Sequence, residues 1–79
     1  MAFTREQVTS IDVGTKLAFS ISGERYSAPT RVTSITCRRE DMHGKLFVHG
    51  YREHGVNGKI SFSIKEGDTL DAKLYRIVE

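Results

Sequence analysis

The fold of this chain is decided between residues 44 and 64, where the sequence reads GKLFVHGY over 44–51 and KISFSI over 59–64. Both runs are rich in β-branched and aromatic residues, which is typical of β-strands. The connection between them contains Asn57-Gly58, a pair that favours the tight turn of a hairpin. We therefore expect two antiparallel strands, at 45–51 and 59–65, at the centre of the fold.

The first of these strands is apolar on both sides. Leu46 and Val48 fall on one side and Phe47 and Tyr51 on the other, so the strand should be central in its sheet or covered by another element such as the N-terminal segment. Gly50 within it indicates a bend or a close approach of another backbone. The second strand should turn its isoleucines and its phenylalanine inward.

Three further strands are predicted at 16–22, 30–38 and 69–78. In the first, Leu17 begins a run in which large apolar and small residues alternate. In the second the alternation slips, because Val32 fits one face while Ile35 and Cys37 fit the other. A β-bulge near Thr33-Ser34 would reconcile them and bend the strand. Cys37, in phase with Ile35, is then expected in the core.

The N-terminal segment predicts a short helix over 4–13. Thr4 can cap it, and Gln7 three residues later can close a capping box. Val8 and Ile11 would form its apolar face, and Gly14 is typical of a helix end. We therefore predict one mainly β domain over residues 1–79. Its short helix precedes a five-stranded, antiparallel, strongly bent sheet that closes into a small barrel of the Sm-like or SH3-like type.

Composition narrows the class of protein. With 79 residues, 38% of them hydrophobic and 28% charged, the chain is typical of one small folded domain. The single cysteine, Cys37, cannot form an internal disulfide, which favours a reducing cytoplasm. No apolar run is long enough for a transmembrane helix, and the N-terminus lacks the apolar core of a signal peptide.

Charge is unevenly distributed, although the net charge is only +2. Residues 25–59 contain seven basic and three acidic residues, so this block carries +4. Such a block can form a basic face for a polyanion, or it can simply solvate strand edges. Aromatic residues such as Tyr26 lie within it and could stack on bases. The predicted contacts to nucleic acid or a nucleotide-like anion are Arg31, Arg38, Arg39, Lys45, His49, Tyr51, Arg52 and Lys59.

The spacing of the histidines, the cysteine and the other candidate reactive residues disfavours a metal site and an enzyme active site. Cys37, His43, His49 and His54 are separated by five, five and four residues, which fits no common zinc motif. No carboxylate pair, activated nucleophile or glycine-rich phosphate loop is evident. We therefore expect neither an enzyme nor a metal or other cofactor.

Residues 16–64 resemble the WYL domain of bacterial regulators. The order of strands matches, with Ser22-Gly23-Glu24 at the first turn, Arg31-Val32 near the Arg-x-Val strand, and 44–51 and 59–64 at the last two motifs. Here Leu46-Phe47-Val48 replaces the Trp-Tyr-Leu triplet, and Lys59 replaces an arginine. The resemblance implies a small barrel with a regulatory role, and a small-molecule sensor as one possible activity.

Two functions stay open from sequence. The first is a non-enzymatic barrel that binds nucleic acid through its basic and aromatic face. The alternative is a protein-interaction module, a stand-alone inhibitor or adaptor of the kind encoded by phages or mobile elements. It would act through a strand edge such as Tyr26–Pro29, or form a homo-oligomer.

Overall fold

The computed structural model of the protein describes residues 2–21, 25–26, 28–68 and 75–78. Its elements are α1 (Arg5–Ser10), β1 (Lys16–Ile21), β2 (Arg25–Tyr26), β3 (Thr30–Glu40), β4 (Leu46–His54), β5 (Gly58–Lys65) and β6 (Tyr75–Val78). All strand pairs are antiparallel. The prediction of a mainly β fold with one short helix is confirmed.

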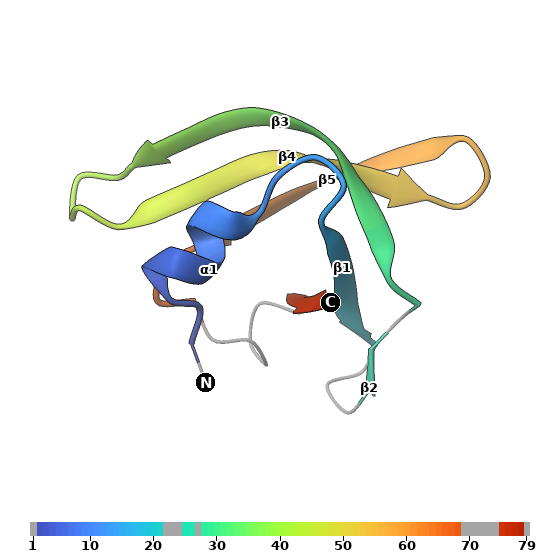
Figure 1. The fold of residues 1–79 in the computed structure, drawn as a ribbon, viewed down its shortest axis with the longest axis horizontal. Helices are drawn as coiled ribbons and strands as arrows, with labels where there is room; N and C mark the ends of the chain where they lie inside the picture. The colour runs from blue at the N-terminus through green and yellow to red at the C-terminus, as the bar shows by residue number, and fades with distance from the viewer. Residues whose placement is uncertain (1, 22–24, 27, 69–74, 79) are drawn as a thin grey trace.

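Four strands lie side by side in the order β1, β3, β4, β5 and curve into a half-barrel around α1 (Figure 1). Strands β2 and β6 both pair with β1. The predicted strand 69–78 lies mostly outside the described residues, and only its last part, β6, is seen. No described helix is long and apolar enough to cross a membrane.

Helix α1 begins as predicted and ends earlier. The Thr4 hydroxyl accepts the Gln7 backbone N–H at 3.1 Å, and the Gln7 side chain accepts the Thr4 N–H at 2.9 Å, so the capping box is confirmed. The backbone is already extended at Ile11. Asp12 and Thr15 then form a turn in which the Thr15 hydroxyl accepts the Asp12 N–H. Because β-branched residues and aspartate are poor helix formers, the predicted end at residue 13 was too late.

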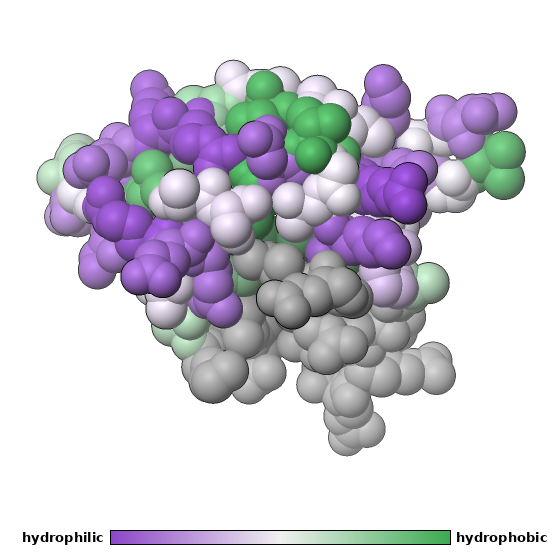
Figure 2. Space-filling view, viewed as in Figure 1, coloured by the Kyte–Doolittle hydropathy of each residue, from purple (hydrophilic) through white to green (hydrophobic). Residues whose placement is uncertain are grey.

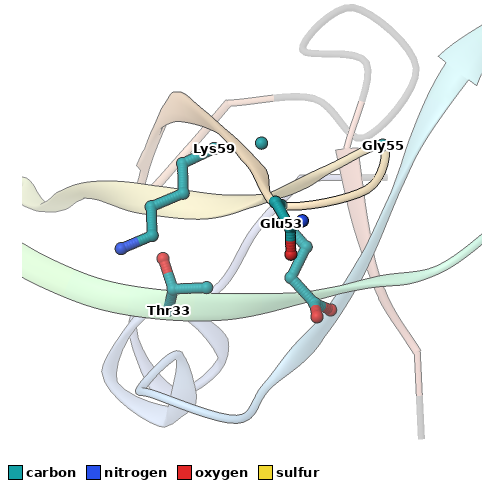
Figure 3. A pocket seen from close by; sticks show the side chains of 6 residues that line it. Thr33, Glu53, Gly55 and Lys59 are labelled. Carbon is teal, nitrogen blue, oxygen red and sulfur yellow. The ribbon is translucent and has the colours of Figure 1, made fainter.

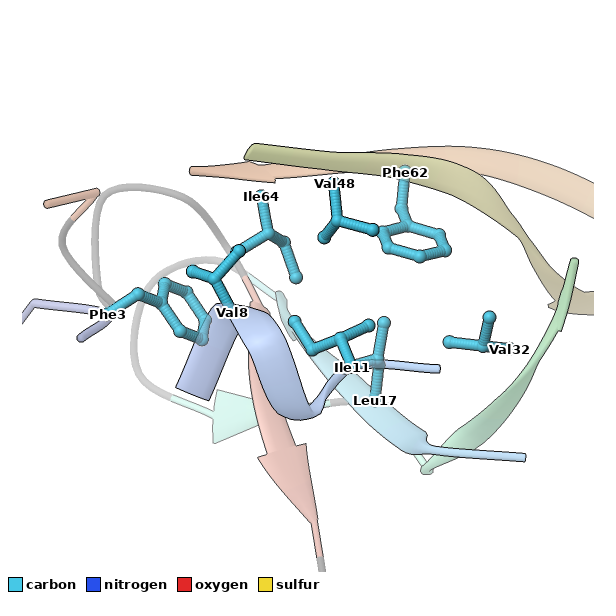
Figure 4. Packing of buried hydrophobic residues seen from close by; sticks show 8 residues of the cluster. All are labelled: Phe3, Val8, Ile11, Leu17, Val32, Val48, Phe62 and Ile64. Carbon is cyan, nitrogen blue, oxygen red and sulfur yellow. The ribbon is translucent and has the colours of Figure 1, made fainter. Parts of the chain in front are cut away.

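The core fills the space between α1 and the concave side of the sheet, as Figure 4 shows. Val8 from α1, Ile11 just after it and Phe3 just before it meet apolar side chains from four strands. Because α1 and the sheet each have one apolar face, each buries that face against the other. The cluster consists of Phe3, Val8, Ile11, Leu17, Val32, Val48, Phe62 and Ile64. The side chains of Phe19 and Ile21, also expected inward, lie outside the described residues.

Two bulges bend β3 where it pairs with β4. The register shifts between Val32 and Ser34, and again between Ile35 and Cys37. The first shift confirms the predicted bulge, and the second was not predicted. The extra residues are Thr33 and Thr36. Their hydroxyls donate to the carbonyls of Tyr51 at 3.2 Å and His49 at 3.0 Å, so each bulge is held by a bond to β4.

Gly50 lies on β4 between the partners of these two bulges. A Cβ atom at this position would lie 2.2 Å from the Ser34 carbonyl oxygen and 3.2 Å from the Phe62 ring. The predicted close backbone approach is therefore confirmed. Only glycine lets β3 pass this near to β4.

The hairpin between β4 and β5 is confirmed, and its strands are longer than predicted. Strand β4 continues through His54, which pairs with Gly58. The turn needs only three residues, and positive φ angles at Gly55 and Asn57 make it possible. As a result, the residues of 52–54 belong to the sheet and not to a loop. Strand β3 is also longer than predicted, because it pairs with β4 as far as Glu40.

Replacing Gly50 by alanine should destabilise the fold, because the new methyl group would overlap a backbone oxygen. We expect the free energy of unfolding to fall by about 1–3 kcal/mol, the usual cost of overpacking. Urea denaturation followed by far-ultraviolet circular dichroism measures it. Ser63→Ala, on an exposed position of β5, should change the same quantity by less than about 0.5 kcal/mol. Equal stability of Gly50→Ala and wild type would contradict the assigned approach.

Candidate nucleic-acid interface

The sheet presents one face away from α1, which we call the outer face. Residues that lie directly opposite each other on paired strands share a face, so the register of β3, β4 and β5 defines it. The outer face consists of Ser34, Cys37, Arg39, Phe47, His49, Tyr51, Glu53, Lys59, Ser61, Ser63 and Lys65. Cys37 is thus half-buried on the outer face, and the expectation that it lies in the core was wrong.

Three ring side chains form a row along β4 on this face. Phe47, His49 and Tyr51 alternate with the inward residues Val48 and Gly50. The rings of His49 and Tyr51 meet edge to face, with centroids 6.3 Å apart and planes at 65°. Tyr51 is 39% exposed, so part of this row is open to a ligand.

A guanidinium group covers one end of the row. The Arg39 guanidinium carbon lies 5.4 Å from the centroid of the Phe47 ring, which is within the range of a cation–π contact. Arg39 comes from β3, directly opposite Phe47 on β4. Its positive charge is therefore held beside the rings and remains exposed.

Small hydroxyl residues flank the row on its other side. Ser61 lies opposite Tyr51 and Ser63 lies opposite His49 on β5, and both are exposed. Because these side chains are short, they leave the ring faces accessible and supply hydrogen-bonding groups. In the view of Figure 2, apolar side chains gather where the loop after α1 crosses the middle of β3 and β4, and hydrophilic side chains lie to either side of them.

The structure separates two neighbouring predicted contacts, Arg38 and Arg39. Successive residues of a strand point to opposite faces, so Arg38 points inward to the end of α1. Its guanidinium donates to the carbonyls of Val8 at 3.1 Å and Thr9 at 2.9 Å, and also to that of Ile11. Cations are favourable at a helix C-terminus because the unpaired carbonyls there are partially negative. Arg38 therefore joins α1 to β3.

Arg52 lies on the inner face and is only 3% exposed. Its guanidinium donates to the Thr30 hydroxyl at 3.3 Å and to the Glu53 carbonyl at 3.4 Å. A ligand on the outer face cannot reach it, because the sheet lies between them. Sequence patterning places Arg52 in a polar loop, whereas the longer β4 carries it into the interior.

The remaining predicted contacts are exposed and lie at the ends of strands. Arg31 is at the start of β3, Lys45 immediately precedes β4, and Lys59 is near the start of β5. Lys59 lies opposite Glu53 on the outer face. The side chain of Tyr26 lies outside the described residues. Of the predicted set, the outer face thus unites Arg39, His49, Tyr51 and Lys59.

Phe47 belongs to the site and was missed as a contact residue. It was assigned to the face shared with Tyr51, but only as an apolar residue. The available signal was the period of two, since residues 47, 49 and 51 are all rings in one strand. Ring residues at alternate positions indicate a continuous row more strongly than any one ring does.

A hollow of about 310 Å³ adjoins the Tyr51 end of the row (Figure 3). Thr33, Glu53 and Lys59 line it, together with the turn residues of the β4–β5 hairpin. The Glu53 carboxylate accepts the Arg31 backbone N–H at 2.9 Å. The outer face thus leads from a guanidinium, along three rings, to a polar hollow.

The turn before β4 is held by one carboxylate. Asp41 accepts the backbone N–H groups of His43 at 2.8 Å and Lys45 at 2.9 Å, and it forms an ion pair with Lys65 at 3.4 Å. The bond from Lys45, with those from His43 and Lys65, lowers the pKa of Asp41, although desolvation acts in the opposite direction. This carboxylate therefore fixes the start of the strand that carries the ring row.

No group of three or more histidine, cysteine, aspartate or glutamate side chains is arranged to hold a metal ion in the described ranges. His43 and His54 lie at opposite ends of β4, next to its two turns.

Comparisons with protein-family models, curated proteins and solved structures find no match. The residues of the outer face are therefore the basis for a functional assignment.

Replacing Arg38 should affect stability through its bonds to α1. Arg38→Met keeps an apolar stem but loses the donors, so we expect the free energy of unfolding to fall by about 1–3 kcal/mol. Arg39→Met, one residue away on the opposite face, should cost less than about 1 kcal/mol. Urea denaturation of both variants tests this. Equal losses in the free energy of unfolding for the two variants would mean that the contacts of Arg38 with α1 do not stabilise the fold.

The lowered pKa of Asp41 predicts a pH-dependent contribution to stability. The contribution is full above the unfolded value, near 3.8, and is lost as the pH falls through the lower folded value. Asp41→Asn should therefore melt below wild type at pH 7, and the difference should shrink as the pH falls below the unfolded value. Differential scanning calorimetry from pH 2 to pH 7 measures both melting temperatures. A difference that does not change with pH would show that the charge of Asp41 is irrelevant.

Proposed function

We propose that the protein binds single-stranded nucleic acid, without catalysis, through the outer face of β3, β4 and β5. The observation that carries this proposal is the row of Phe47, His49 and Tyr51 on the outer face of one strand, with the Arg39 guanidinium over the first ring. Bases stack on aromatic side chains regardless of their identity, and each stacked base contributes about 1–3 kcal/mol. A row of rings therefore suits an extended strand of unpaired bases.

The charges around the row are placed to contact phosphates. Arg39 lies at one end of the outer face and Lys59 at the other, and Lys45 is exposed just before β4. A backbone that follows the row would pass all three. Lys65 contributes less, because it is paired with Asp41. Few cations mean modest affinity, so stacking has to supply much of the binding free energy.

The half-barrel also supports closure into the small barrel that the WYL resemblance implies. The chain leaves β5 at one edge of the four strands and returns as β6 beside β1, at the other edge. The Phe3 N–H donates to the Asp68 carbonyl, and the Gly67 N–H donates to the Phe3 carbonyl. These bonds attach the N-terminus to the end of β5. We include a closed barrel in the proposal.

Fluorescence anisotropy with labelled ten-nucleotide RNA and DNA strands at low salt tests the function. We expect saturable binding, with a dissociation constant of about 1–100 µM, in the range of non-specific complexes. Tyr51→Ala should weaken it about tenfold through lost stacking. Arg39→Ala should also make the dependence on salt shallower, by a slope of about 0.7 in log–log form.

Two variants serve as controls in this titration. Tyr51→Phe keeps the ring and should bind like wild type. Lys16→Ala removes an exposed charge from β1, outside the face formed by β3, β4 and β5, and should have little effect. Absence of saturable binding at 100 µM protein, or full binding by Tyr51→Ala, would overturn the proposal.

The alternative, a protein-interaction module, has one observation in its favour. Strand β2 is only two residues long and lies at the end of the strand path, beside β1. A strand at the edge of a sheet leaves backbone N–H and C=O groups unpaired, and a strand of another chain can pair with them. Light scattering on the same sample distinguishes the two functions, since a stable oligomer without affinity for nucleic acid would favour this one.

A further inference from the structure

The hollow beside Tyr51 combines a fixed carboxylate with an ammonium group. Glu53 and Lys59 lie opposite each other on β4 and β5, and Thr33 from β3 lines the same hollow. Figure 3 shows the three side chains on neighbouring strands, with the Lys59 ammonium and the Glu53 carboxylate pointing away from each other. Its volume of about 310 Å³ is at the lower end of the range for small-ligand pockets.

The carboxylate of Glu53 is held in place and keeps acceptor capacity. Its Oε1 atom accepts the Arg31 backbone N–H at 2.9 Å, which restricts the side chain. Among the described residues Glu53 forms no ion pair with a lysine or arginine. An ionised carboxylate has about four lone-pair sites, so it can accept further bonds from a ligand that carries N–H donors.

We propose that this hollow recognises guanine, in the nucleotide whose base stacks on Tyr51. This inference rests on the proposed function. Tyr51 and Glu53 are two residues apart on the same face, so their Cα atoms are separated by roughly 7 Å. A base stacked on the ring of Tyr51 can therefore extend its edge over Glu53.

Guanine matches the groups on the two strands. Its Watson–Crick edge presents two adjacent donors, N1–H and N2–H, which the two oxygens of Glu53 can accept together. The neighbouring O6 acceptor then faces the side of Lys59. Cytosine, adenine and uracil each present a single donor position on that edge, so they can satisfy only one carboxylate oxygen. Charge-assisted bonds of this bidentate kind are among the strongest in proteins.

Binding of four five-nucleotide RNAs, UUGUU, UUAUU, UUCUU and UUUUU, tests the inference by fluorescence anisotropy. A single guanine avoids association between strands. Wild type should bind UUGUU about tenfold more tightly than the other three, within the discrimination expected of one bidentate contact. Glu53→Gln presents one oxygen and one amino group, so it should bind UUGUU and UUUUU equally. It can still accept the Arg31 N–H, and an unchanged melting temperature checks that it folds.

The matched control is Glu6→Gln, which removes a carboxylate from the first turn of α1 and should keep the preference for UUGUU. Equal affinity of wild type for all four strands would overturn guanine recognition while leaving the proposed function standing. A preference for UUGUU that persists in Glu53→Gln would overturn the role of Glu53. Absence of binding to every strand would overturn both the proposed function and this inference.

Discussion

The structure depends on the close approach of β3 to β4 at Gly50. There the Ser34 carbonyl occupies the space that any side chain at position 50 would need. The two bulges on either side hold β3 in this position through their threonine hydroxyls. Because β3 bends here, the inner face becomes concave and can enclose α1, while the outer face becomes convex and presents its rings.

This curvature links the core to the candidate site. Val48 and Phe62 fill the concave side, and His49 and Tyr51 alternate with inward residues on the same strand. A strand that is central in its sheet can be apolar on one face for packing and aromatic on the other for a ligand. The rings of β4 are therefore placed by the same backbone that builds the core, and their spacing is set by the pleat.

Much of this architecture could be predicted from residues close together in sequence. The capping box, the hairpin, the first bulge and the role of Gly50 each have a local signal. The second bulge has no local signal. Cys37 is apolar and lies two residues after Ile35, so a regular strand would place both side chains in the core. The end of α1 was also misjudged, since the turn of Asp12 and Thr15 competes with the helix.

The candidate site was only partly predictable, for a tertiary reason. Counting basic residues identifies the basic block at residues 25–59, but it cannot show which guanidinium groups form hydrogen bonds within the fold. Arg38 is used by the end of α1, and Arg52 is buried because β4 is longer than its apolar run suggests. Arg39, the residue after Arg38, is exposed over a ring. Whether each arginine is exposed depends on its distance from α1 and on the length of β4. Neither can be read from neighbouring residues in the sequence.

The bulge threonines have a consequence for how this fold can be altered. Since each is the extra residue in its bulge, deleting both would leave every other side chain of β3 on its present face. The deletion would remove the bend of β3, and the sheet would no longer enclose α1. The curvature of the sheet and most of the outer-face chemistry are thus set by different residues, and Thr33 contributes to both because it also lines the hollow beside Tyr51.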